Sequence, residues 1–287
     1  MIFNVYDTPA DCYRSKIVCC SSGRTSELEI PVQEIDCEGR IYGLSYEALA
    51  SIRPDYGYRN RRPEFRSLLD NGIERYEPET GHVSRVLHIG CLVEDAASRH
   101  GLLPKRFKLN HIMASPGCEK TAFLFRYFVE HRRITDLYSF DFTRNRPSLE
   151  VADVGVSHAC WWDSQRLITT RQGPGGFGYY FIPIGEDAPP ELICRSRDGH
   201  PSKMTDTSLL TNSYPDEFGL RTLLALDLKT RLFENLATSP EPLLFQGENR
   251  CDFHPSLSPS GRWIQFDCAA GYRRTLAVME NPLYSAE

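Results

Sequence analysis

The stretch "CDFHPSLSPSGRWIQFD" (Cys251–Asp267) combines a histidine, a Ser-Pro turn and an alternating strand. The stretch "DGHPSKMTDTSLLTNSYPD" (Asp198–Asp216) repeats the same order. Similar units begin at His111 and His158, so the pattern recurs every 40 to 55 residues or so, roughly the length of a propeller repeat. Each unit has a polar turn, a strand, a polar loop and a second strand, with period-2 alternation in the strands. A β-only unit of this length, repeated in tandem, is typical of a β-propeller blade.

The repeat predicts an all-β chain that forms a single β-propeller domain of four-stranded blades. At this period the 287 residues hold about six blades. The first is partial because its strand pattern is ragged, and the second carries the insertion "RPDYGYRNRRPEFRSLLDNG". The expected blades are residues 1–35, 36–105, 106–152, 153–195, 196–246 and 247–287.

Composition restricts the class of partner. The formal net charge is −5, which provides no basic field for nucleic acid or an anionic membrane surface. The N-terminal residues lack the basic and then apolar pattern of a signal peptide, and no apolar run is long enough to span a membrane. Ten cysteines without such a signal predict reduced thiols. We therefore expect a cytoplasmic protein without nucleic-acid or membrane partners; the sequence leaves its oligomeric state open.

The repeat gives the histidines a common position. Equivalent residues in successive blades point toward the same region of a propeller, so four imidazoles are expected to meet at one mouth of the channel: His111, His158, His200 and His254. Neutral histidines gathered there can bind a metal ion, or one of them can act as a base. In the alternative, each imidazole hydrogen-bonds a neighbouring blade and only supports the ring. Four such positions flanked by polar residues favour a site.

The units also resemble a known family. "NHIMASP" (110–116), "SHACW" (157–161), "DGHPS" (198–202) and "CDFHPSLSPSGRW" (251–263) are similar to the TolB-like propellers, and more specifically to the oligogalacturonate-lyase-like group. The resemblance covers about Asn110–Asn281 and relates the chain to seven-bladed propellers. The Ser-Pro-Asp-Gly turns of the group are altered here, as in "SPSG" at Ser258. The resemblance implies a divalent metal held by histidines and a glutamine, and a separate histidine that removes a proton.

Carried over by position, this resemblance assigns individual roles. His200 and His254 match two metal-ligating histidines, and Cys251 stands where the family has the glutamine. A set of one cysteine and two histidines favours zinc over manganese because thiolate is the softer ligand. His158 matches the proton-abstracting histidine. His111 has no assigned counterpart and is kept as a second catalytic candidate.

The implied reaction is β-elimination on an acidic, uronate-containing oligosaccharide. It requires a base, a charge that neutralises the sugar carboxylate and an acid for the leaving oxygen. The further candidates are Tyr179 and Tyr214 as acids, Arg221 and Arg250 for the carboxylate, and Asn110 and Trp162 for binding the sugar. The alternative function is a non-catalytic propeller that binds a carbohydrate or a protein. We expect an enzyme of the carbon-oxygen lyase class, acting with zinc or manganese.

Overall fold

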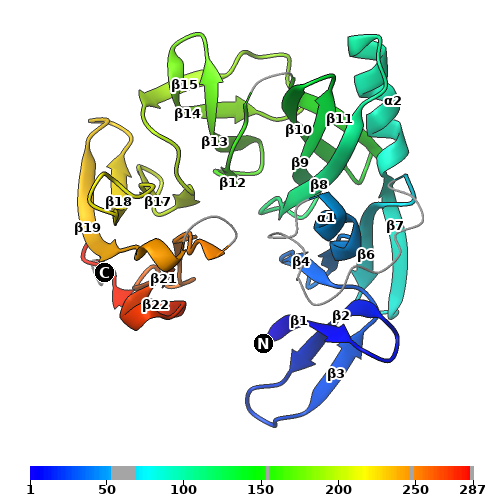
Figure 1. Cartoon of the computed structure of the whole chain (residues 1–287), viewed down its shortest axis with the longest axis horizontal. Coiled ribbons are helices and arrows are strands. Elements are labelled where there is room, and N and C mark those ends of the chain that lie inside the picture. The colour runs from blue at the N-terminus through cyan, green and yellow to red at the C-terminus, as the bar shows by residue number, and fades with distance from the viewer. Residues whose placement is uncertain (53–68, 153–154, 246–248, 285–287) are drawn as a thin grey trace. The chain divides into compact units, whose positions relative to one another are not determined.

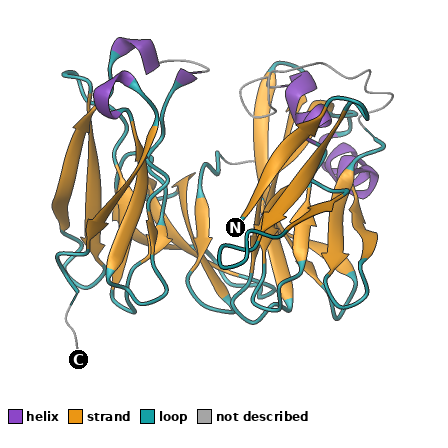
Figure 2. Cartoon of the chain, turned by 90° about the horizontal axis from the view of Figure 1, so that it is seen from below, coloured by secondary structure: helices purple, strands orange, loops and turns teal. Residues whose placement is uncertain are grey.

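The structure is a computed structural model that describes residues 1–52, 69–152, 155–245 and 249–284. The described residues form six antiparallel sheets in chain order, and strands dominate over helices (Figures 1 and 2). The expectation of an all-β chain with six propeller blades is confirmed. Residues 53–68, most of the insertion expected in the second blade, lie outside the described ranges.

The chain divides into two compact units, Met1–Asp153 and Val154–Glu287. Unit 1 holds three blades. The first has three strands, β1 (Ile2–Asp7), β2 (Cys12–Val18) and β3 (Thr25–Leu28). The second has four, β4 (Val32–Ile35), β5 (Ile41–Gly43), β6 (Gly72–Glu77) and β7 (His82–His88). The third also has four, β8 (Lys105–Ala114), β9 (Lys120–Val129), β10 (Arg132–Asp141) and β11 (Arg146–Val151). Two helices, α1 (Tyr46–Ile52) and α2 (Ile89–His100), accompany these blades.

A buried polar network attaches α2 to the third blade. Arg99, in the last turn of α2, donates to the carboxylate of Asp136 at 2.6 Å. Tyr127 donates to the same carboxylate at 2.8 Å, and His100 lies 3.0 Å from the Tyr127 hydroxyl. Because a buried charge is costly unless it is paired, this network requires α2 to dock in one position.

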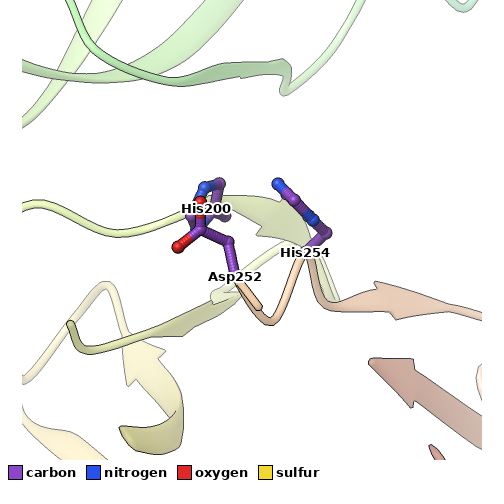
Figure 3. A group of neighbouring side chains, drawn as sticks. All are labelled: His200, Asp252 and His254. Carbon is purple, nitrogen blue, oxygen red and sulfur yellow. The ribbon is translucent and has the colours of Figure 1, made fainter. Parts of the chain in front are cut away.

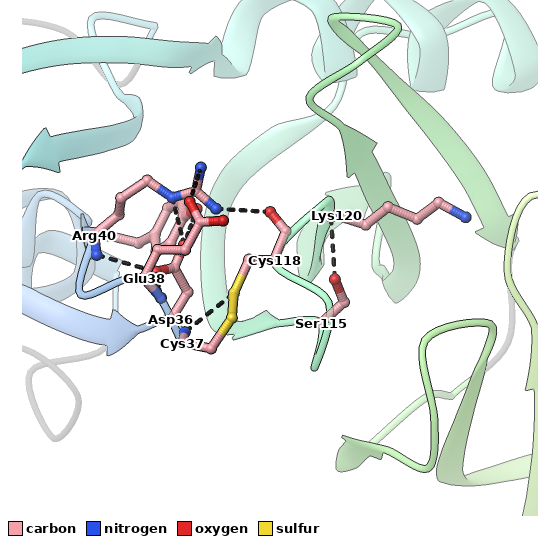
Figure 4. Close-up of a disulfide and its surroundings, with 8 residues drawn as sticks. Asp36, Cys37, Glu38, Arg40, Ser115, Cys118 and Lys120 are labelled. Carbon is pink, nitrogen blue, oxygen red and sulfur yellow. Dashed lines mark hydrogen bonds and ion pairs between the residues drawn. A yellow bond between two sulfur atoms is a disulfide. The ribbon is translucent and has the colours of Figure 1, made fainter.

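A disulfide joins the second and third blades of unit 1 (Figure 4). It links Cys37, after β4, to Cys118, in the turn between β8 and β9, across 81 residues of sequence. Arg40 donates to the Cys118 carbonyl at 2.8 Å and also pairs with Asp36. The expectation of reduced thiols is therefore wrong for this pair, because folding brings two distant loops together. The remaining cysteines are free.

Unit 2 holds the last three blades. The fourth blade contains β12 (Ala159–Trp161), β13 (Arg166–Gly173), β14 (Gly176–Pro183) and β15 (Glu191–Arg195). The fifth contains β16 (Ser202–Lys203), β17 (Ser208–Asn212), β18 (Leu220–Asp227) and β19 (Phe233–Pro240). The sixth contains β20 (Ser256–Leu257), β21 (Trp263–Cys268) and β22 (Thr275–Glu280). In the described residues, the 3₁₀ turn η1 (Leu243–Phe245) lies between β19 and β20, and η3 (Ala270–Tyr272) lies between β21 and β22.

Alternation along the strands builds the core between the fifth and sixth blades. In β21, Ile264 and Phe266 are buried, whereas Gln265 between them is exposed. Ile264 and Phe266 pack with Leu223 of β18 in one apolar cluster. Because alternate residues of a strand point to opposite faces, this packing fixes the register of the sixth blade. The loop before β20 contributes Phe253 to this cluster. The loops before β12, β16 and β20 each carry one histidine of the repeat.

Candidate metal and base site

Three of the four repeat histidines meet. The ring centroids of His158 and His200 are 4.0 Å apart, and those of His200 and His254 are 4.6 Å apart. Each residue lies just before the first, short strand of its blade, so three successive blades contribute one imidazole each. The repeat in the sequence therefore places these side chains in one cluster within unit 2.

His200 is fixed in one tautomer by Asn212, the last residue of β17. The Asn212 side-chain oxygen lies 2.9 Å from His200 Nδ1 and also accepts the His200 backbone N–H at 3.2 Å. The Asn212 amide group donates to the Ser213 carbonyl at 2.8 Å, which sets the orientation of the amide. Nδ1 therefore carries the proton and Nε2 keeps its lone pair. Burial, together with the charges of His158 and His254, lowers the pKa of His200 to about 3, so the ring is neutral at pH 7.

His254 and Asp252 complete the group (Figure 3). Ligand atoms of His200, Asp252 and His254 all lie within 4.8 Å of one another. His254 is 58% exposed, has a positive φ of 40°, and its Nδ1 lies 3.3 Å from the Asp267 carboxylate. Phe253, between the two ligands, is buried in the apolar cluster of the sixth blade. Packing of this aromatic ring thus holds the residues on either side of it near His200.

The Asp252 carboxylate has unequal oxygens. Oδ2 accepts a hydrogen bond from Arg250 Nε at 2.7 Å. Oδ1 is buried and accepts no hydrogen bond from the described residues, although an Arg221 nitrogen lies 3.3 Å away as an ion pair. A buried carboxylate oxygen without a hydrogen bond is unusual, and metal coordination is one of the arrangements that satisfies it. The carboxyl stays ionised because hydrogen bonding by Arg250 and the charges of neighbouring cations outweigh burial and lower its pKa.

The structure groups Asp252 with the histidines where the sequence analysis expects Cys251. Cys251 is buried with Phe245 and Ala269 in a small apolar cluster. Burial raises the pKa of its thiol to about 11, so in the metal-free protein the sulfur is protonated at pH 7.

His158 has its own carboxylate partner. Its Nδ1 lies 3.2 Å from Asp198 Oδ1. Ser157 and Thr170 each donate a hydroxyl to Asp198 at 2.6 Å. Although burial opposes ionisation, the hydrogen bonds from His158, Ser157 and Thr170 lower the Asp198 pKa to about 2. Asp198 has no role assigned from the sequence, and its place two residues before the repeat histidine His200 is the signal that was available.

Two residues expected to bind the sugar carboxylate differ in accessibility. Arg250 is partly exposed at the edge of the cluster. Arg221 is only 2% exposed and forms ion pairs with Glu241 and Asp252, so it is not available to a substrate. This burial disfavours its expected role, which stays a prediction. Tyr214 lies in the cluster, with its ring centroid 6.0 Å from that of His200.

Two aromatic candidates belong to the core. Tyr179 is buried, and its hydroxyl lies 2.5 Å from the hydroxyl of Thr211. Trp162 is buried against Phe181, with the Lys203 ammonium 4.9 Å from its ring centroid. A ring that stacks on a sugar must expose one face, and a general acid must reach the leaving group. Their burial in the blade core disfavours the expected roles of Tyr179 and Trp162, which stay predictions.

Asn110 and His111 lie in unit 1, on β8. The register of β8 against β9 shifts between Asn110 and Met113, and His111 in this bulge has a positive φ of 55°. The buried Asn110 amide makes no side-chain hydrogen bond within the described part of the chain. Their expected catalytic and sugar-binding roles remain predictions.

Solved structures share the fold. No family model matches the sequence, and no curated protein matches it. TolB from Acinetobacter baumannii aligns with 97% of this chain at a TM-score of 0.58 and 15% identity, and this chain spans 60% of TolB. The chain has the fold of the TolB-like β-propellers. An oligogalacturonate lyase in complex with manganese shares it at a TM-score of 0.57 and 10% identity, covering 96% of this chain and 84% of the lyase.

The same fold also serves other activities. The acylaminoacyl peptidase of Pyrococcus horikoshii aligns with 99% of this chain at a TM-score of 0.60 and 7% identity, and the chain spans 44% of that peptidase. Since this TolB-like fold carries unrelated functions, the activity must be argued from the site. In the described residues, no helix is long and apolar enough to cross a membrane.

Proposed function

We propose that unit 2 is a metal-dependent lyase centre that acts by β-elimination on a uronate-containing oligosaccharide. Two observations carry the proposal. Ligand atoms of Asp252, His200 and His254 lie within 4.8 Å of one another, and Oδ1 of Asp252 accepts no hydrogen bond from the described residues. The Nδ1 atoms of both imidazoles face oxygen partners, Asn212 for His200 and Asp267 for His254. Such partners orient metal-binding histidines and leave Nε2 for the ion.

The donor set suits a borderline divalent ion. Two imidazole nitrogens and one carboxylate oxygen bind zinc or manganese, and the remaining positions would belong to water or substrate. The thiolate argument that favoured zinc no longer applies, because Cys251 is outside the group. A bound ion would act as a Lewis acid toward the sugar carboxylate and so increase the acidity of the neighbouring carbon.

His158 is the base in this proposal. Asp198 holds the Nδ1 side of the ring, so Nε2 is the atom that accepts the proton from the sugar's C5. The electrons of the broken C5–H bond form a double bond to C4, and the C4–O bond breaks toward its oxygen. That oxygen takes a proton from Tyr214, the tyrosine that lies beside His200. Arg250 is placed for the substrate carboxylate because its guanidinium is partly exposed beside Asp252.

The proposal is tested by metal content and product formation in the same samples. The wild-type protein is loaded with manganese or zinc, desalted and analysed for metal, and then incubated with acidic oligosaccharides while the ultraviolet absorbance of an unsaturated uronate is followed. We expect one ion per chain and product formation. The His158→Asn variant should keep the ion and lose the product. The matched control is His131→Asn, because His131 is an exposed residue of the β9–β10 turn.

The outcomes separate the two functions. Metal and product in the control, but no product with His158→Asn, support the lyase. Wild-type protein that binds neither metal ion contradicts the proposed centre and favours the alternative, a propeller that binds a carbohydrate or a protein without catalysis.

A further inference from the structure

A buried ion pair lies behind the metal ligand Asp252. Arg221 of β18 donates through Nε and a terminal nitrogen to Glu241 Oε2, at 3.1 and 2.5 Å. The same terminal nitrogen is 3.3 Å from Asp252 Oδ1. All three side chains are almost fully buried. Arg221 therefore lies between two carboxylates, one of which faces the histidines.

Glu241 is held in place by its own contacts. It follows β19 directly, and its other oxygen, Oε1, is 3.4 Å from the backbone N–H of Cys251, the residue before Asp252. The Arg221 guanidinium also packs over the rings of Tyr214 and Phe253, at 5.3 and 5.7 Å. Glu241 thus contacts both the arginine and the backbone of the ligand-bearing loop.

Glu241 offsets the charge of Arg221 beside Asp252. A guanidinium nitrogen 3.3 Å from Asp252 Oδ1 would by itself weaken the attraction of that carboxylate for a cation. Glu241 supplies the second negative charge and draws the shorter contacts of Arg221 to itself. In a buried setting such charges are weakly screened, so the compensation is felt at Asp252.

We propose that Glu241 is a positioning residue that sets the affinity of the metal site: by binding Arg221, it leaves Asp252 Oδ1 available to a divalent ion. The inference rests on the proposed metal centre. It assigns a function to a carboxylate outside the ligand group, and it distinguishes Arg221, a structural cation, from Arg250, which faces the substrate side.

The test measures Mn²⁺ or Zn²⁺ binding by calorimetry in four proteins. Glu241→Gln keeps the shape and removes the charge, and we expect affinity to fall by about 10-fold or more, as for other groups behind metal ligands. Arg221→Met with Glu241→Gln removes the whole pair. The double variant should bind within about twofold of wild type, because the excess positive charge is gone and Arg250 still holds Asp252. Replacing a whole buried ion pair usually preserves folding. Glu234→Gln is the matched control, because Glu234 is an exposed glutamate of β19, the strand that directly precedes Glu241.

A purely structural role gives a different pattern. If Glu241 only stabilised the fold, Glu241→Gln would bind the ion like wild type once folded, and this result would overturn the inference while leaving the metal centre intact. A double variant as weak as Glu241→Gln would also overturn it. Absence of binding in the wild type and the Glu234→Gln control would overturn the metal centre itself.

Discussion

Replacing Asn212 with leucine should remove the support of His200, which we propose as a metal ligand. The side-chain oxygen of Asn212 accepts two hydrogen bonds, from His200 Nδ1 and from the His200 backbone N–H. Leucine fills nearly the same space and accepts neither, so two buried donors lose their partner. Each such donor costs about 1–3 kcal/mol, so the two together predict a loss of about 2–6 kcal/mol in the free energy of unfolding. Because the ring is no longer oriented, metal affinity should fall by about 10- to 100-fold.

Two measurements on one preparation test this prediction. Urea denaturation gives the free energy of unfolding, and calorimetric titration with Mn²⁺ or Zn²⁺ gives the affinity. Leu209→Ala is the control, because Leu209 is fully buried on the same strand and its truncation costs about 2–5 kcal/mol without touching His200. The control should lose stability and keep its metal affinity. If Asn212→Leu lost stability and bound the ion as tightly as wild type, the orienting role of Asn212 would be refuted.

Three further predictions concern pH, a tyrosine and the disulfide. The pKa of His200 is about 3 in the fold and 6.5 in the unfolded chain, so protonation favours the unfolded state. The free energy of unfolding should therefore fall as pH drops from 6.5 toward 3, by up to about 1.4 kcal/mol per pH unit from this residue. Urea denaturation at a series of pH values measures this slope, which should be flatter for His200→Asn. Tyr179→Phe should cost about 1 kcal/mol in urea denaturation and leave metal affinity unchanged, since its hydroxyl contacts only the core. Cys118→Ala removes the Cys37–Cys118 disulfide and should lower the free energy of unfolding of unit 1 by about 2–4 kcal/mol, measured by denaturation under oxidising conditions. Metal binding should be unchanged, and its loss would contradict a purely structural role for this disulfide.

The repeat in the sequence was sufficient to predict the fold and the meeting of three histidines. Both depend on a pattern that recurs along the chain, and the loops before β12, β16 and β20 carry it directly. The repeat does not show which way a single side chain points. Cys251 lies next to Asp252, and the packing of Phe253 decides which of the two lies near the histidines. Trp162 lies four residues after His158, and the packing of the fourth blade buries it.

Charge pairing was the other property that the sequence could not resolve. Arg221 and Arg250 are equivalent as residue types, and both flank the histidines in the sequence. The fold buries Arg221 between Glu241 and Asp252 and leaves Arg250 partly exposed. Glu241 lies 11 residues before Asp252 without any repeated motif, so its contact arises from the return of the chain after β19 rather than from spacing. The carboxylate of Asp198 lies two residues before the repeat histidine His200 in the sequence, yet its hydrogen bond to His158 requires two blades to be adjacent.

The unequal exposure of His200 and His254, the two histidines of the proposed metal site, has a kinetic consequence. His200 is buried and clamped by Asn212, whereas more than half of the His254 side chain is in contact with solvent. An ion held by both would lose the outer imidazole first and keep the inner one until last. Exchange with free metal would then proceed stepwise through His254, so substitutions there should change dissociation rates more than substitutions at His200 change them. A bound ion would therefore exchange with free metal in solution instead of being permanently enclosed.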